Sequence, residues 1–178
     1  MADERLDAWS ASPAVRTIHR RSAAAGPEAL WQQATGVRID ETRSLGRLVR
    51  WRIPGTEPGI TYHDLFRTYP FCVLEEDRFL LITGLCGKIW TLTRDYPRLG
   101  GPREFTDWQE PGTVRVVFAH SVREAGDGRA ELVSEARVEP VDARAALRLR
   151  ALWAVIGHFE RLVGAEPLAL AARRAEGR

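Results

Sequence analysis

The alternation of apolar and polar residues is clearest between residues 114 and 140, where it predicts two long β-strands. Between the strands, the sequence AGDGRA centres a tight turn on Asp-Gly, which is typical of a β-hairpin. Side chains two residues apart lie on the same face of a strand. One face of the hairpin is therefore expected to carry Val114, Val116, Phe118, His120 and Val122, together with Leu132, Ser134, Ala136 and Val138.

Similar patterns predict further strands at 15–22, at 46–55, and as a pair within 71–92 that is joined near residues 76–78. In the strand predicted at 46–55, Arg50 and Arg52 alternate with apolar residues and are expected to face solvent. Pro54 and Gly55 would end it.

The remaining stretches are expected to be less regular. The charged residues 1–13 predict a loose, flexible arm. Residues 57–70 are expected to be a loop or a partly ordered insert, and the Gly- and Pro-rich residues 93–105 another loop.

Helical signals appear in two places. In residues 26–36, Pro27 suits a first turn and Gly36 an end, which predicts a short helix. From residue 143 to residue 173 nearly every residue favours a helix, with Asp142 as its cap and Pro167 as the exception. An antiparallel sheet with one apolar face needs a cover, and only this long helix is large enough to supply it. The predicted class is α+β.

Several local motifs resemble one family. They are PEALWQQATG at 27–36, ITGLCGKIW at 82–90, EPGTVRVVFAHSV at 110–122, and ELVSEARVEPVDARAALRLRALW at 131–153. Their order is similar to that of an uncharacterised bacterial branch of the START-like superfamily, also called the polyketide cyclase or SRPBCC superfamily. The resemblance implies a helix-grip fold, in which a curved antiparallel sheet wraps around a long C-terminal helix. It implies one such domain over residues 14–178, with a deep and largely apolar cavity between sheet and helix.

Composition narrows the classes of function. The 178 residues, 44% of them hydrophobic, suffice for one domain with one core. The 26 basic and 24 acidic residues are interleaved, which argues against nucleic acid as the main partner. Cys72 and Cys86 are expected to be buried free thiols. No stretch is long enough to insert into a membrane, and the first residues do not form a signal peptide, so a cytoplasmic location is expected.

Candidate site residues come from the two elements that would enclose the cavity. On the long helix, Ile156 belongs to the apolar stripe, while Trp153 and Glu160 lie on one flank of it. Glu160 either faces the cavity or reaches solvent at the edge of the stripe. On the strand, His120 is either a general acid or base, or a histidine of the core.

Aromatic residues complete the expected ligand-binding set, because Trp90, Trp108, Phe118 and Trp153 fall on predicted inward faces or on the helix. The leading hypothesis is a protein that binds a small apolar or aromatic molecule. One alternative is an enzyme of the polyketide cyclase/dehydratase type that uses His120 or Glu160, and another is a protein-interaction module. No cofactor is expected, and the four histidines show no metal-ligand spacing.

Overall fold

The structure, a computed structural model, describes residues 2–52, 55–57, 59–91 and 96–177, and the side chains of these except residues 2, 3, 52 and 155–164. Its centre is a five-stranded sheet in the order β1-β5-β4-β3-β2, in which each neighbouring pair is antiparallel. The strands are β1 (Val15–Ala23), β2 (Cys72–Asp77), β3 (Leu80–Gly87), β4 (Val114–Gly126) and β5 (Arg129–Pro140). The strands predicted at 15–22, within 71–92 and in the hairpin are confirmed.

The register of the hairpin places the predicted apolar residues on one face. His120 pairs with Ser134, and Phe118 pairs with Ala136. The turn between β4 and β5 has positive φ at Gly126, Asp127 and Gly128, a conformation that favours glycine and tolerates aspartate. We call the face that carries Phe118 and His120 the inner face, and the opposite one the outer face.

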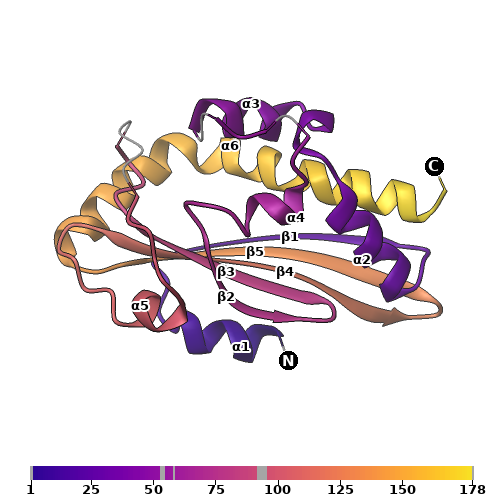
Figure 1. Ribbon diagram of the computed structural model, residues 1–178, viewed down its shortest axis with the longest axis horizontal. Coiled ribbons are helices and arrows are strands. Elements are labelled where there is room, and N and C mark those ends of the chain that lie inside the picture. Colours follow the sequence, from indigo (N-terminus) through magenta and orange to yellow (C-terminus); the bar gives the residue numbers. More distant parts are fainter. Residues whose placement is uncertain (1, 53–54, 58, 92–95, 178) are drawn as a thin grey trace.

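Helices lie on both faces of the sheet (Figure 1). They are α1 (Ala2–Trp9), α2 (Pro27–Gly36), η1 (Ile39–Glu41), α3 (Ser44–Arg52), α4 (Tyr62–Leu65), α5 (Pro102–Thr106) and α6 (Ala143–Ala175). The helices α2, α3, α4 and α6 are on the inner side, whereas α1 and α5 are on the outer side. The predicted α+β class and the long C-terminal helix are confirmed.

Helix α6 begins at the predicted cap and then covers the inner face. The Asp142 carboxylate accepts hydrogen bonds from the backbone N–H of Ala145 at 2.7 Å and of Gly112 at 2.6 Å. Near the start of the helix Leu149 is fully buried against the sheet, and near its end Leu168 packs with residues of α2 and the hairpin. The cap therefore also fixes the loop that leads into β4.

The prediction of a strand at 46–55 is wrong, because residues 44–52 form helix α3. Leu45 and Val49, four residues apart, are both buried, whereas Trp51 is 56% exposed. The buried apolar residues thus follow helical spacing. In so short a stretch the sequence fits both this spacing and the alternation that is typical of a strand. Arg50 is exposed as expected, while the side chain of Arg52 and residues 53–54 lie outside the part that the structure describes.

Helix α3 is held at its N-terminal end by a carboxylate from α6. Glu166 accepts hydrogen bonds from the backbone N–H of Arg43 at 2.6 Å, of Ser44 at 2.9 Å and of Leu45 at 3.3 Å. Burial alone would raise the pKa of Glu166, but these three donors lower it below its ordinary value. A charged side chain thereby satisfies backbone groups that a helix start leaves without partners.

The loose arm predicted for residues 1–13 is wrong for Ala2–Trp9, which form helix α1 against the outer face. Leu6 is only 2% exposed, and the rings of Trp9 and Phe105 make an edge-to-face contact at a centroid distance of 6.4 Å. The buried residues of this outer cluster are Leu6, Leu74, Leu80, Ile82, Cys86, Phe105, Val117 and Ala119.

The outer cluster depends on a glycine in β3. A Cβ atom at Gly84 would lie 2.6 Å from two atoms of the Phe105 ring, closer than carbon atoms approach. Glycine at this position therefore lets α5 lie directly on the strand.

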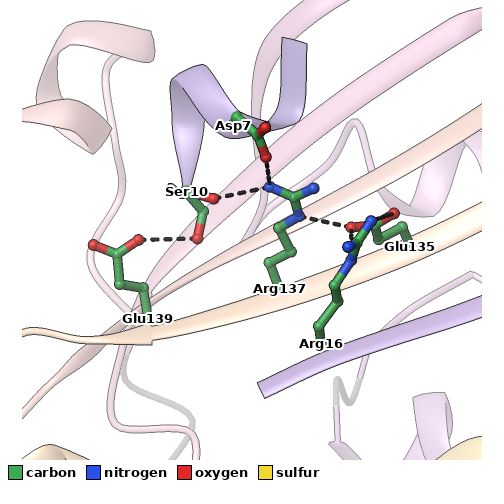
Figure 2. Close-up of polar contacts among 6 residues, drawn as sticks. All are labelled: Asp7, Ser10, Arg16, Glu135, Arg137 and Glu139. Carbon is green, nitrogen blue, oxygen red and sulfur yellow. Dashed lines mark hydrogen bonds and ion pairs between the residues drawn. The ribbon is translucent and has the colours of Figure 1, made fainter. Parts of the chain in front are cut away.

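Polar residues beneath α1 fasten it to the sheet. Figure 2 shows them: Asp7, Ser10, Arg16, Glu135, Arg137 and Glu139. Arg137 and Glu135 are each 3% exposed and are joined by a 2.6 Å hydrogen bond from Nε. Arg137 also donates to the Asp7 carboxylate at 2.5 Å and to the Ser10 carbonyl at 2.9 Å, and Arg16 donates to Glu135 at 2.7 Å. The buried charges are thus paired on several sides.

We predict that Glu166→Gln lowers the free energy of unfolding by about 1–2 kcal/mol, because a neutral amide binds the start of α3 less strongly. Backbone amides of α3 should also exchange with solvent faster than in the unaltered protein. Urea unfolding and hydrogen exchange measure the two effects. Glu124→Gln, at an exposed position, is the control. Equal losses in both variants would contradict the prediction.

We predict that Glu135→Gln costs about 3–5 kcal/mol, because it leaves Arg137 buried without its carboxylate. Asp7→Asn should cost clearly less, since the Asp7 side chain is 61% exposed. Urea unfolding of both variants at neutral pH tests this order, and the reverse order would show that Glu135 is not the main counter-ion of Arg137.

Candidate functional site

Aromatic side chains from two separate parts of the chain meet on the inner face of the sheet. β4 contributes Phe118 and His120, and the segment that contains α4 contributes Tyr62, Phe66 and Phe71. The Phe66 ring lies 4.6 Å from His120, 5.0 Å from Phe118 and 4.8 Å from Phe71, measured between centroids. The Tyr62 ring lies 4.8 Å from His120. We call these five rings the ring cluster.

The segment 57–70, predicted as a loop or a partly ordered insert, supplies two of these rings. Thr61 caps α4 by accepting a hydrogen bond from the N–H of Asp64 at 3.0 Å, and the N–H of Tyr62 donates to the Val37 carbonyl at 2.6 Å. Phe66 is buried at the end of the short helix. The signal for this packing was the high aromatic content of residues 60–71, which is unusual for a solvated loop.

His120 is a buried polar side chain without a polar partner. It is 5% exposed, and neither ring nitrogen has a hydrogen-bond partner among the described residues. Burial, with a smaller contribution from His63, lowers the pKa of His120 to about 3. The imidazole is therefore neutral at physiological pH, and it has one donor and one acceptor to offer.

Two further polar groups share this side of the sheet. The Thr83 hydroxyl and the Trp90 indole N–H are buried, and neither has a hydrogen-bond partner within the described residues. Thr83 pairs with Phe118 across β3 and β4, and Leu81, two residues before Thr83, pairs with His120. Thr83 and His120 are thus diagonal neighbours on the inner face. Buried polar atoms without partners are uncommon in proteins, and they often mark a functional site.

A small cavity adjoins His120. Its volume is about 20 Å³, and it is lined by Trp31, Ala34, Thr35, Tyr62, His63, His120, Leu132, Pro167 and Leu168. A space of this size holds one water molecule. The lining comes from α2, α4, both strands of the hairpin and α6, so the cavity lies where sheet and helices meet.

A second histidine lines the same cavity. His63 is half-buried, and its ring makes an edge-to-face contact with Trp31 at a centroid distance of 5.8 Å. Burial and the nearby Arg67 lower the pKa of His63. His63 already contacts the Arg67 guanidinium through Nε2 at 3.2 Å, whereas both nitrogens of His120 stay available to a ligand with an apolar body and one or two polar atoms.

The predicted site residues are brought together only in part. Trp90, Phe118 and Trp153 pack around one inner cluster with Leu149, and His120 follows Phe118 on the same face. The prediction that Trp108 faces inward is wrong. Trp108 packs against the outer cluster, because the stretch before β4 crosses to the side of α5. Its indole Nε1 donates to the Thr113 hydroxyl at 2.9 Å.

Two candidates on α6, Ile156 and Glu160, have side chains that lie outside the described part of the chain. The sequence interpretation missed three residues next to His120, namely Tyr62, Phe66 and Thr83. The first two were hidden by the loop prediction for 57–70, and the third is a short polar residue in an apolar strand.

The buried cysteine of β3 is not suited to act as a nucleophile. Burial raises the pKa of Cys86 to about 12, so this free cysteine stays a thiol.

Within the described residues, no group of three or more His, Cys, Asp or Glu side chains is placed to hold a metal ion. The described helices include none that is long and apolar enough to span a membrane. The exposed large apolar side chains lie in separate parts of the chain, namely Ile18 on β1, Trp51 on α3, Tyr69 in the turn before β2 and Leu147 on α6.

No protein-family model matches this chain, and no curated protein matches it. Three solved structures align over most of its length. A Thermus thermophilus protein is 9% identical over 90% of this chain and 97% of that chain, with a TM-score of 0.35. The Zhui aromatase/cyclase from a Streptomyces species is 13% identical over 90% of this chain and 94% of that chain, with a TM-score of 0.34. A hypothetical protein from Helicobacter pylori is 8% identical over 92% of this chain and 89% of that chain, with a TM-score of 0.39.

Identities and TM-scores this low transfer no function to the chain. The five-stranded antiparallel sheet and the long C-terminal helix of this chain agree with the arrangement expected from the sequence. Fold alone leaves the chemistry of the site open.

We predict that acid destabilises the protein through His120. The unfolded chain takes up a proton below the ordinary histidine value of 6.5, whereas the folded protein does so only near 3. The free energy of unfolding should therefore fall by up to about 2 kcal/mol between pH 7 and pH 5, where most carboxylates stay ionised. Urea unfolding across this range measures the slope.

The matched variant is His120→Leu, which removes the buried base. It should show a much flatter pH dependence, with a smaller slope left from His63. At pH 7 it should be more stable by about 1–2 kcal/mol, because it removes polar atoms without partners. The same slope in both proteins would assign the acid sensitivity to other groups.

Proposed function

We propose that this protein binds a small, largely apolar or aromatic molecule between the inner face of the sheet and helix α6. The observation that carries the proposal is His120, whose two ring nitrogens are buried beside a cavity without partners among the described residues. Keeping such atoms desolvated costs stability, and a polar atom of a ligand would offset that cost. Thr83 offers a further hydroxyl on the same face.

The cavity sets a condition on binding. A volume of about 20 Å³ admits one polar atom of a ligand and not its body. The body must therefore displace part of the ring cluster, and Tyr62 and Phe66 are the residues that would move, since they belong to a short helix and its end. Their replacement by ligand rings would exchange one aromatic contact for another.

A cyclase/dehydratase-type enzyme is the second candidate, because two imidazoles, those of His63 and His120, line one cavity. With a pKa of about 3, His120 is a weak base at neutral pH. Its role in such an enzyme would be to polarise a carbonyl group as a neutral hydrogen-bond donor. For either function we propose the cytoplasm, where Cys72 and Cys86 would stay reduced.

The test compares two ligands of the same shape, 1-naphthol and 1-methylnaphthalene, by calorimetric titration. The unaltered protein should bind 1-naphthol about tenfold more tightly, because only its hydroxyl can hydrogen-bond to His120. His120→Leu should lose this preference while it keeps its affinity for 1-methylnaphthalene. Equal affinities for both ligands in the unaltered protein would overturn the role of His120.

A matched pair of variants on α2 tests the location. Ala34 lines the cavity, whereas Ala29 is exposed on the same helix. Ala34→Leu should abolish binding of 1-naphthol, and Ala29→Leu should leave it unchanged. Native mass spectrometry of the freshly purified protein then asks whether a ligand is already bound. Binding that survives Ala34→Leu would place the ligand elsewhere.

A further inference from the structure

The outer face of the sheet contains a groove that the proposed function does not use. Its volume is about 430 Å³, which lies within the range of small-molecule sites. It is lined by Arg5, Leu6, Arg20, Asp77, Arg78, Phe79, Leu80, Ala119, Ser121, Val122, Arg123, Val133 and Glu135. The groove lies between helix α1, the turn that joins β2 to β3, and the outer surface of β4, β5 and β1.

The groove is apolar at its centre. Leu6 and Leu80 are buried members of the outer cluster, and Ala119 is only 4% exposed. Val133 is half-buried and pairs with Ser121 on β4, so both side chains face the groove. A flat apolar group placed here would continue the contacts that α1 makes further along the sheet.

Charged groups surround this apolar centre, and most of them are already paired. Arg5 binds Glu75 and Asp77, Arg78 binds Glu28, and Arg123 binds Glu131. The two carboxylates of the lining are also engaged: Asp77 accepts from Arg5, and Glu135 accepts from Arg16 and Arg137. Their charges are therefore compensated before any ligand binds.

Arg20 differs from the other arginines of the groove. It is exposed on the edge strand β1, where it pairs with Val133. Among the described residues, no ion pair or side-chain hydrogen bond engages its guanidinium. A guanidinium presents parallel N–H groups that match a carboxylate or a sulfonate.

We propose that this outer groove binds a small organic anion, a carboxylate or sulfonate with a flat apolar body, through Arg20. The body lies on Leu80, Ala119 and Val133, and the anionic group pairs with the Arg20 guanidinium. The volume fits a molecule of two or three rings. The groove is too short and its charges too well balanced for a nucleic acid, which needs a continuous basic surface.

The test uses 8-anilinonaphthalene-1-sulfonate, an anion with an apolar ring system, in calorimetric titrations. Arg20→Gln should weaken its binding about tenfold, because it removes the charged partner of the sulfonate. Arg21→Gln is the matched control: it removes the same charge at the next residue, which pairs with Leu132 and so belongs to the inner face. This variant should bind the probe about as well as the unaltered protein.

Two further measurements separate this groove from the His120 cavity. Ser121→Phe fills the floor of the groove and should abolish binding of the sulfonate, while it leaves 1-naphthol binding at the inner face unchanged. N-phenyl-1-naphthylamine, which has the same rings without the sulfonate, should show no difference between Arg20→Gln and Arg21→Gln. Circular dichroism confirms that each variant is folded.

Two results would overturn the proposal. One is the absence of sulfonate binding by the unaltered protein, and the other is equal weakening in Arg20→Gln and Arg21→Gln. The second result would show a response to net charge and not to the Arg20 guanidinium. Neither result bears on the inner site, which 1-naphthol reports independently.

Discussion

The pairing of Arg137 with Glu135 beneath α1 is the interaction on which the outer half of this molecule depends. Two charges that are each 3% exposed are stable there only because other chain segments reach them. Asp7 and Ser10 come from the N-terminal helix and its end, and Arg16 comes from β1 (Figure 2). The position of α1, the burial of the outer cluster and the edge of the adjacent groove all follow from this one arrangement.

The two faces of the sheet differ in whether their buried polar groups have partners. On the outer face the buried charges have partners on several sides, as a structural role requires. On the inner face the hydrogen-bonding atoms of His120, Thr83 and Trp90 are buried and find no partner in the described part of the chain. Local rules that hold in most of a protein are commonly broken at its functional site. The buried charges of the outer face are thus compensated within the protein, whereas the inner face keeps hydrogen-bonding atoms available for the ligand that we propose there.

Much of the fold was predictable from local patterns, and the failures have physical causes. The hairpin of β4 and β5 and the long helix α6 are extended, regular and capped by residues with strong local preferences. Around α3, by contrast, Leu45 and Val49 have helical spacing while nearby residues alternate, and only packing against other elements decides between helix and strand. Helix α1 is short and half of its residues are charged, and contacts of Leu6 and Asp7 with distant strands hold it in place.

The candidate site was predictable only where it lies on regular elements. Phe118 and His120 followed from strand alternation, whereas Tyr62 and Phe66 come from a four-residue helix and its end, which no periodicity identifies. Whether the His120 nitrogens find partners depends on every residue around them. It is therefore a property of the tertiary structure and has no signature in the sequence.

The place of β1 in the sheet has a consequence for how the chain is made. This strand lies at one edge, and β5 is its only neighbouring strand in the described sheet. Among the five strands β1 is synthesised before the others, and its partner β5 is complete only once residue 140 has been added. The ion pair of Asp7 likewise cannot form until Arg137 has been synthesised. The hairpin and α6, by contrast, are assembled from residues close together in the chain, where closing a loop costs little entropy. Helix α1 and strand β1 are therefore translated before their partners and are among the last described elements to reach their final places.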